Sequence, residues 1–456
     1  MKKKWLKFFS ITMLVIFTSN FFVGCAGSGG SGSSASAPTT EAANDNKTET
    51  PKADVTQSEE AAPEVIKIGF LTPLTGASAA LGQQVEWAAN MIVDLVNEEH
   101  PESSMELAKG AGLPNLNGAK LQLVVADHKS DATTAVAEAK RLITEEHVVA
   151  ITGEFTSALI KAVAVVTEQY EIPLLAAGSA VTLTDGSTPL HWFFRFGVND
   201  ATYIKDTFDF LTMLNETQNA EIKTVAFLSE DSEFGANIVI QELKYAEEGG
   251  FTVAENISYP ASSTNLTAEV LKIKAADPDV LIMASFVSDA LLFINTCKEQ
   301  NYTPKLIVGQ RGGFIQPDYL EAMGEGNNYI CTTGSWSSDL NSAVTQELVK
   351  LYPEKYSNGV ALSDGHVKDI ACLLFVAMAI NQAGTTDSAA VQSALRDLDF
   401  DINTLIIPWN DITMNEFGQN TSANGIVAQW IDGKYRTVYP ADVASEKAVY
   451  PMPTWD

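Results

Sequence analysis

The distribution of apolar and polar residues along the chain predicts strands and helices in regular alternation. Residues 65–71 form an apolar, strand-like run that stops at the turn residues Thr72 and Pro73. Residues 83–97 carry apolar side chains at positions 85, 88, 89, 92 and 96, the spacing of one helix face. The alternation continues with strands predicted at 121–126, 148–152 and 173–176 and helices at 132–143 and 157–169.

The same pattern starts again after the apolar segment 192–195. This second set has predicted strands at 224–228, 251–257, 280–284 and 305–308, and predicted helices near 235–248, 265–275 and 289–300. Repeated strand–helix–strand units indicate a parallel sheet with helices on both faces and right-handed crossovers. Two successive sets therefore predict an α/β protein with two similar, Rossmann-like lobes.

The last third of the chain follows another pattern. Helices are predicted near 341–356 and 366–383, and the second contains the apolar run 370–380, which is too short for a membrane span and indicates a buried helix. Short strands are predicted around Ile412, at 426–431 and at 435–438, the last two joined by a hairpin at Asp432-Gly433.

The first 64 residues contain none of this periodicity. A basic start, an apolar stretch over residues 8–23 and the junction Gly24-Cys25 have the parts of an export signal over residues 1–25. The junction resembles the lipobox of bacterial lipoproteins, which implies that Cys25 becomes the lipidated first residue of the mature protein. Residues 26–64 are poor in large apolar side chains, so we expect a disordered tether. An uncleaved membrane anchor and a signal without a lipid are the alternatives.

Composition narrows the class of partners. The formal net charge of -28 argues against nucleic acid and against an anionic membrane surface. Besides Cys25 there are three cysteines, too few for a disulfide scaffold. Cys297 and Cys331 could pair or stay free, whereas Cys372, inside an apolar run, is predicted to be a buried free thiol.

No catalytic or metal-binding motif stands out. The sequence contains no HExxH, GxSxG, GxxxxGK[ST], paired CxxC or EF-hand pattern. Its histidines are not spaced as metal ligands, so each is predicted to be a surface or structural histidine. We therefore expect no enzyme, no cofactor and no metal site.

Ligands of open parallel sheets bind where the strands end and the helices begin. The sharpest such segment is 153–157, where a predicted strand stops at Gly153. Thr156 or Ser157 can cap the next helix while leaving backbone N–H groups for an anion. The alternative is that Ser157 is an N-cap and nothing more.

Several dispersed segments, in order, resemble the leucine/isoleucine/valine-binding family of type I periplasmic binding proteins. They are Ile68-Gly69-Phe70-Leu71-Thr72-Pro73-Leu74-Thr75-Gly76, Leu81-Gly82, Leu116-Asn117-Gly118, Val124-Val125-Ala126-Asp127, Ala276-Asp277-Pro278-Asp279-Val280, Asn415-Glu416-Phe417-Gly418-Gln419-Asn420 and Trp430-Ile431-Asp432-Gly433-Lys434. The resemblance covers residues 65–456.

The resemblance implies the solute-binding subunit of an ABC importer, a monomer that hands a small molecule to a permease and its ATPase. It implies lobes of residues 65–197 with 335–405 and of residues 198–334 with 406–456, joined by a three-strand hinge. With the leader, it implies an extracytoplasmic protein anchored by lipid to the bacterial cell membrane, at its outer face or in the periplasm. A ligand-sensing protein that reports to a membrane receptor is the alternative function.

The resemblance also implies site residues. Ser157 would hold a ligand carboxylate with backbone N–H groups, next to the apolar Phe155. The loop Gly178-Ser179-Ala180 stands where the family has an Ala-Thr pair, and Phe234 and Phe286 occupy aromatic positions. The remaining predicted contact is Leu81.

Arg311 departs from the family pattern, because it stands where an acid would receive the ligand's α-ammonium. A guanidinium repels an ammonium group but grips a carboxylate. We therefore expect an amino acid or a related small carboxylate or amide as ligand, with Glu154 as a weaker candidate for an ammonium group. The alternative is that Arg311 points outward or pairs with an acidic neighbour: Glu230, Asp231 or Asp289.

Overall fold

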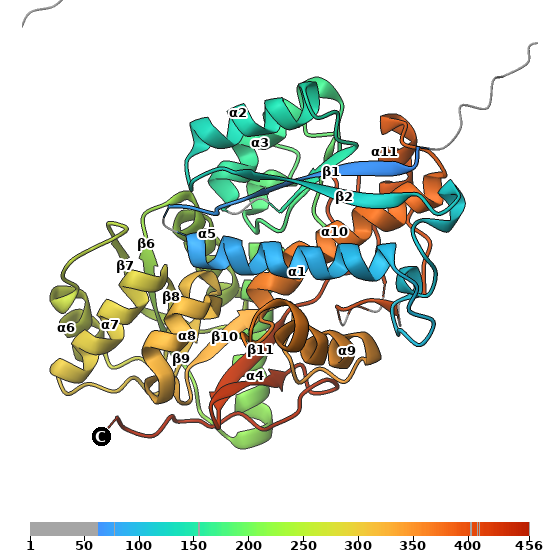
Figure 1. The fold of residues 1–456 in the computed structure, drawn as a ribbon. Helices are drawn as coiled ribbons and strands as arrows, with labels where there is room; N and C mark the ends of the chain where they lie inside the picture. Colours follow the sequence, from blue (N-terminus) through green and yellow to red (C-terminus); the bar gives the residue numbers. More distant parts are fainter. Residues whose placement is uncertain are drawn as a thin grey trace, which may run out of the picture. The chain divides into compact units, whose positions relative to one another are not determined.

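The computed structural model describes residues 63–76, 78–153, 156–401, 404–407, 409 and 411–455, which contain two separate β-sheets (Figure 1). The predicted leader, the lipidation site Cys25 and almost all of the predicted tether lie outside these residues, as do Glu154 and Phe155. By its contacts, Glu60–Asp456 is one compact unit.

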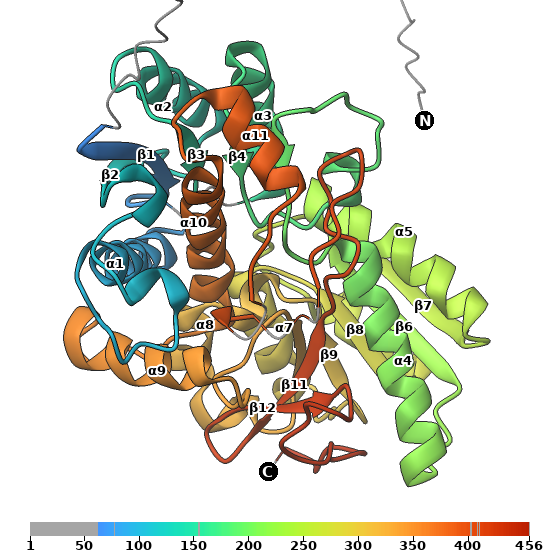
Figure 2. The same ribbon diagram turned by 90° about the vertical axis from the view of Figure 1, so that its right-hand side faces the viewer.

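The first sheet is parallel throughout and has the order β2-β1-β3-β4-β5. Its strands are β1 (Val65–Thr72), β2 (Lys120–Asp127), β3 (Ala150–Thr152), β4 (Leu174–Leu175) and β5 (Phe193–Phe194). Residues of β1 pack against α1 (Ala79–Asn97) and α10 (Asp364–Ala383) on one face, and the opposite face packs against α2 (Ala132–Thr144) and α3 (Ser157–Tyr170) (Figures 1 and 2). The short helix α11 (Ser388–Arg396) packs on α10.

The second sheet has the order β12-β11-β10-β9-β8-β6-β7. Strands β6 (Thr224–Glu230), β7 (Thr252–Tyr259), β8 (Val280–Ala284), β9 (Ile307–Gly309) and β10 (Cys331–Gly334) are parallel, whereas β11 (Ile426–Ile431) and β12 (Lys434–Tyr439) form an antiparallel hairpin at its edge. Helices α4 (Asp200–Gln218) and α5 (Glu233–Glu248) cover one face, and α6 (Thr267–Ala276), α7 (Val287–Glu299) and α8 (Pro317–Met323) cover the other. Helix α9 (Ala343–Leu351) follows β10. The helical turn Tyr352–Tyr356, directly after α9, packs against α1.

The chain passes between the sheets three times: after β5, after β10, and between α11 and β11. The fold class predicted from the sequence is confirmed, as are the hairpin at Asp432-Gly433 and the strand 280–284. The predicted strand at Ile412 is wrong, since that region has only an isolated bridge between Met414 and Asn420. The assignment of residues to two lobes stays a prediction.

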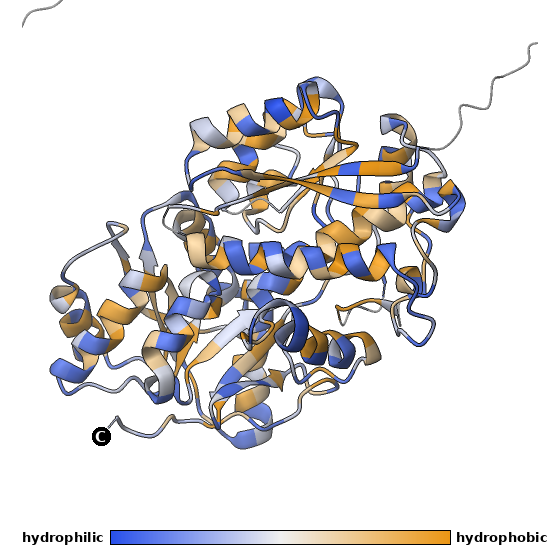
Figure 3. Cartoon of the chain, in the orientation of Figure 1, coloured by the Kyte–Doolittle hydropathy of each residue, from blue (hydrophilic) through white to orange (hydrophobic). Residues whose placement is uncertain are grey.

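Helix α10 is the apolar core of the region around the first sheet. It is long and apolar enough to cross a membrane by length and composition, but 72% of its most apolar window is buried inside the fold. The helix is correspondingly apolar over most of its length in Figure 3. Cys372, on this helix, is a buried free thiol as predicted, and Cys297 and Cys331 are also buried and unpaired.

The side chain of Asp369, on α10, is buried in the fold, and its Oδ1 has no hydrogen-bond partner among the described residues. Burial raises the pKa of Asp369 from 3.8 to about 6. The folded state therefore binds this proton more tightly than the unfolded state does, and the stability it contributes is lost as pH rises from about 4 through 6.

We expect Asp369→Asn to increase the free energy of unfolding at pH 8 by roughly 2 kcal/mol, because the neutral amide avoids ionisation in the core. Near pH 3, where the parent carboxyl is mostly protonated in both states, most of this gain should be absent. Urea unfolding at the two pH values measures the effect, and the exposed Asp318→Asn serves as control. An equal effect of Asp369→Asn at both pH values would show that ionisation of the buried carboxyl group is not its cause.

Candidate functional site

Loops that follow strands of both sheets meet at a small cavity of about 40 Å³. It is lined from the first sheet's side by residues after β3 and β4 and by Lys368 of α10, and from the second sheet's side by residues after β6, β8 and β9. The lining residues are Thr156, Ser157, Ile160, Ala177, Gly178, Ser179, Phe234, Phe286, Arg311, Gly312, Ile315 and Lys368. Six predicted site residues are thus brought together: Ser157, Gly178, Ser179, Phe234, Phe286 and Arg311.

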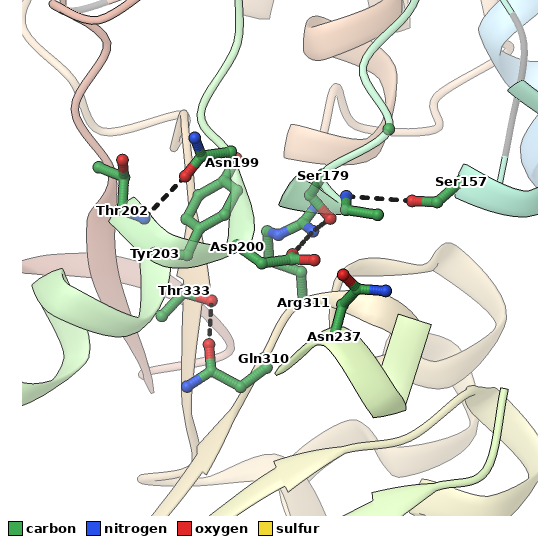
Figure 4. A network of polar contacts seen from close by, with 12 residues as sticks. Ser157, Ser179, Asn199, Asp200, Thr202, Tyr203, Asn237, Gln310, Arg311 and Thr333 are labelled. Atoms are coloured by element: carbon green, nitrogen blue, oxygen red, sulfur yellow. Dashed lines mark hydrogen bonds and ion pairs between the residues drawn. The ribbon is translucent and has the colours of Figure 1, made fainter. Parts of the chain in front are cut away.

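Ser157 joins two loops of the first sheet. Its Oγ accepts a hydrogen bond from the backbone N–H of Ala180 at 3.2 Å, which ties the start of α3 to the loop after β4 (Figure 4). Neither Thr156 nor Ser157 makes a side-chain cap of α3. The hydroxyl hydrogen of Ser157 consequently remains available as a donor at the cavity.

Arg311 reaches from the second sheet to the first. Its Nη2 donates to the hydroxyl of Ser179 and lies 3.5 Å from Oδ1 of Asp200 (Figure 4). The guanidinium also stacks 4.2 Å from the ring centroid of Tyr203. Its Nε and Nη1 donate to no other group in the described part of the chain, so these N–H groups are left for a ligand.

The backbone at Arg311 is strained, with φ at 54° and ψ at -112°. A residue with a side chain adopts this region at a cost, and such strain gathers at functional sites. The conformation places a buried cation, 6% exposed, at the cavity wall.

Arg311 does not pair with the acidic residues that the sequence suggested. Glu230 instead accepts from the backbone N–H groups of Ser232 and Gly235, while Asp231 and Asp289 accept from the backbone N–H groups of residues 261 and 262. The ionic partner is Asp200, at the start of α4. Burial raises the pKa of Asp200, and the nearby Arg311 opposes that shift.

The aromatic part of the cavity wall comes from two loops of the second sheet. The rings of Phe234 and Phe286 lie 5.5 Å apart at a tilt of 38°. Phe155, predicted to complete this wall, lies outside the described residues, and so does Glu154. The two described rings give the cavity an apolar part of its wall.

Two predicted contacts are not among the residues that line the cavity. Leu81 is buried and would meet a Cβ placed on Gly365 at 3.2 Å, so it packs under α10. Ala180 is buried beside Ser157 and presents its backbone to other parts of the protein.

Sequence reasoning missed Asp200 and Lys368. Asn199-Asp200 carries a helix N-cap signal, and the Asn199 side chain does accept from the backbone N–H of Thr202 at 2.9 Å. Lys368 lies two residues ahead of the apolar run 370–380 and lines the cavity, and the sequence carries no local signal that marks it as a site residue.

The arrangement suits the binding of a small molecule. Within the described residues, no group of three or more His, Cys, Asp or Glu side chains is placed to hold a metal ion. The site gathers hydroxyl groups, a cation and aromatic rings from two sheets, which is the set of groups that holds a small polar molecule.

Two α/β layers whose loops converge on one cavity, with three connections between them, define a two-lobed solute-binding fold. A family model described as "Periplasmic binding protein" matches residues 65–434. The chain belongs to the periplasmic binding protein family, and its resemblance to the leucine/isoleucine/valine-binding proteins is confirmed.

A curated relative and solved structures agree with this assignment. The Leu/Ile/Val-binding protein homolog 7 of Brucella suis biovar 1 is 28% identical over 398 residues, which are 85% of this chain and 94% of the relative. The substrate-binding protein LivJ from Streptococcus pneumoniae, in complex with isoleucine, has a TM-score of 0.68 at 22% identity and covers 82% of this chain and 100% of its own. A solute binding protein of an ABC transporter from Rhodopseudomonas palustris BisB5, in complex with 3,4-dihydroxybenzoic acid, has a TM-score of 0.67 at 18% identity, covering 85% and 99%.

Proposed function

We propose that this protein is the extracytoplasmic solute-binding subunit of an ABC importer and that it captures an amino acid or a related small carboxylate or amide. The observation that carries the proposal is the convergence of Ser157, Ser179 and Arg311 from two sheets on one cavity. A ligand held by both sides would stabilise the closed arrangement of the two lobes, because it binds that arrangement more tightly than the open one.

The polar groups select for a carboxylate or a carbonyl oxygen. The hydroxyl of Ser157 and the Nε and Nη1 of Arg311, which donate to no group in the described part of the chain, are all donors. Hydrogen bonds to a charged group are worth about 1.5–3 kcal/mol each. Asp200 neutralises part of the charge of Arg311, so an uncharged amide oxygen is also an acceptable partner.

The cavity of about 40 Å³ is small for such a molecule. Ligand entry therefore requires the loops of the two sheets to separate, and the hydrogen bond between Arg311 and Ser179 has to give way. We infer that a ligand carboxylate takes the place of the Ser179 hydroxyl at Nη2 of Arg311.

Export and anchoring complete the proposal. The leader, with the Gly24-Cys25 junction, supports a lipid anchor at Cys25 and a tether that holds the folded part at the membrane. The permease and ATPase that would receive the ligand belong to the proposal through the family resemblance alone.

The test is a thermal-shift screen of the chain from Glu60 onward against amino acids, dicarboxylates, aromatic acids and amides. We expect stabilisation by a carboxylate or amide, and a loss of affinity of roughly 10- to 100-fold on Arg311→Ala, which corresponds to one or two charge-assisted hydrogen bonds. Ser157→Ala should cost about 10-fold. Titration calorimetry of each hit measures both effects.

Arg436→Ala, which removes a half-buried arginine of β12, is the matched control and should leave the affinity unchanged. Full affinity of a folded Arg311→Ala protein for its ligand would contradict the role of the guanidinium. Chemical turnover of any stabilising compound would contradict the binding function itself.

A further inference from the structure

A second and much larger cavity, of about 370 Å³, lies near the start of α10. Its walls come from α1, α8, the segment after β10, the segment before α10 and the hairpin of β11 and β12. This volume falls in the range of small-molecule sites in proteins. Of the residues that line the first cavity, Ile315 alone lines this one as well.

The walls of the second cavity are mainly aromatic and aliphatic. Trp336, Trp430 and Tyr435 supply aromatic surface, and the rings of Trp430 and Tyr435 meet edge to face at 5.0 Å. The aliphatic lining residues are Ile315, Leu320, Val360, Leu362 and Ile426. Walls of this kind favour an occupant with a largely apolar body.

Three charged residues line this cavity. Glu321 and Lys434 both line it, with opposite signs. A third charged residue, Asp364, is 7% exposed, and its Oδ1 accepts from the backbone N–H groups of Ser335 and Trp336 at 2.8 and 2.9 Å. Oδ2 of Asp364 has no partner among the described residues. The lining thus holds two carboxyl groups and one ammonium group, which disfavours an anionic occupant, and the mainly apolar walls favour an uncharged one.

Gln84 gives the cavity a donor of fixed orientation. The backbone N–H of Ser363 donates to Nδ1 of His366 at 3.1 Å, so the ring hydrogen of the neutral imidazole sits on Nε2. Burial lowers the pKa of His366 to about 3 and so keeps the ring neutral. Nε2 lies 3.1 Å from Oε1 of Gln84, which makes that oxygen the acceptor.

The amide nitrogen of Gln84 is then the free end of the side chain. It donates to no group among the described residues, and Gln84 is half-buried at the cavity wall. A ligand oxygen can take the place of water at these two N–H groups, because a direct hydrogen bond replaces a solvent one at little cost.

We propose that the second cavity is a binding site for an uncharged, mainly apolar aromatic or alicyclic molecule that carries a hydrogen-bond acceptor such as a carbonyl oxygen. The apolar body lies against Trp336, Trp430 and Tyr435, and the acceptor meets the amide of Gln84. This site does not depend on the function proposed for the first cavity, since Arg311, Ser157 and Ser179 take no part in it.

The probe for the test is 6-propionyl-2-(dimethylamino)naphthalene, an uncharged aromatic ketone whose emission moves to shorter wavelength in apolar surroundings and when its carbonyl loses a hydrogen bond. We expect saturable binding of one probe per chain from Glu60 onward, with blue-shifted emission. Ala361→Trp, at the exposed rim of the cavity, should weaken binding at least 10-fold. Gln84→Leu should retain bound probe but shift its emission further to the blue.

Ala275→Trp, exposed on α6, is the matched control for the added ring, and Arg311→Ala is the control for binding at the first cavity. Neither should change the affinity for the probe. Circular dichroism and thermal unfolding confirm that each variant is folded. Absence of saturable binding, equal binding by Ala361→Trp, or a loss of probe on Arg311→Ala would each overturn the proposal.

Discussion

Replacing Arg195 by methionine is expected to lower the free energy of unfolding by about 4 kcal/mol, the largest effect of any single charge deletion proposed for this protein. Arg195 is fully buried directly after β5, where the chain leaves the first sheet. Nη1 donates to the carbonyl oxygens of Gly178 and Ala180, both at 2.8 Å. Nε donates to Oε1 of Gln419 at 2.6 Å, and Nη2 donates to the hydroxyl of Thr184.

Methionine fills much the same space but donates none of these hydrogen bonds. The Ala180 carbonyl keeps the N–H of Leu183 as a donor and Oε1 of Gln419 keeps the hydroxyl of Thr184, whereas the Gly178 carbonyl loses the donor supplied by Arg195. Hydrogen bonds to a charged group are worth about 1.5–3 kcal/mol each, which is why the loss should be large despite similar packing. Burial lowers the pKa of Arg195 to about 10, so the guanidinium is still charged at pH 7 and supplies all these bonds.

The same substitution should weaken ligand binding, because Arg195 holds the loop 178–180 on which Ser179 stands. Arg195→Lys is the informative partner variant: it keeps the charge but loses the planar fork, and should recover only part of the stability. Urea unfolding at pH 7 measures the stability, and titration calorimetry with a hit from the screen measures the binding. A loss below about 1 kcal/mol for the methionine variant would show that the loop is held by other contacts.

The contacts of Arg195 are an example of what the sequence alone does not predict. Its partners are 11 to 224 positions away in the chain, and no local pattern encodes which carbonyl groups a buried guanidinium will find. The same holds for Arg311, whose partner Asp200 lies 111 positions away and was not among the acidic residues considered from the sequence.

Local patterns predicted the fold much better than they predicted the polar contacts. Strands such as β8 and helices such as α10 have sustained apolar periodicity, and their positions follow from it. Helix α4 was missed although Ile204, Phe208 and Leu211 give it an apolar face. Two other missed elements, β10 and α8, lack this signal. Strand β10 is made of Cys-Thr-Thr-Gly, and its buried threonines satisfy their hydroxyl groups through neighbours such as Gln310. Helix α8 has seven residues, too few to show a helical period.

Part of the candidate site was predicted from the sequence and part was not. The strand-end rule and the family resemblance led to six residues that do line one cavity. The second cavity was not anticipated, because its walls combine five separate segments, and Gln84 gains its orientation only through His366 and Ser363. Burial and tautomer are properties of the packed chain, so they become visible only in three dimensions.

The second large loss of stability is expected for a substitution in the loop that carries Gln419. Gly418→Ala is expected to lower the free energy of unfolding by at least about 3 kcal/mol. Gly418 has φ at +76°, and a Cβ there would lie 2.2 Å from the carbonyl oxygen of Phe193. Its own carbonyl accepts from the backbone N–H of Arg195 at 2.8 Å, so the loop cannot move away without breaking that contact.

Gly433→Ala separates the cost of a left-handed backbone from the cost of a steric clash. Gly433 has almost the same φ, +77°, but a Cβ there would have no atom within 4 Å. Its substitution should therefore cost about 1–2 kcal/mol, the price of the left-handed backbone alone. The difference between the two variants, measured by urea unfolding, reports the close approach of residues 418 and 193. Equal losses would mean that backbone strain decides both sites and that the loop yields around Arg195; a clearly larger loss at Gly418 would show that the junction between the first sheet and the C-terminal segment is rigid.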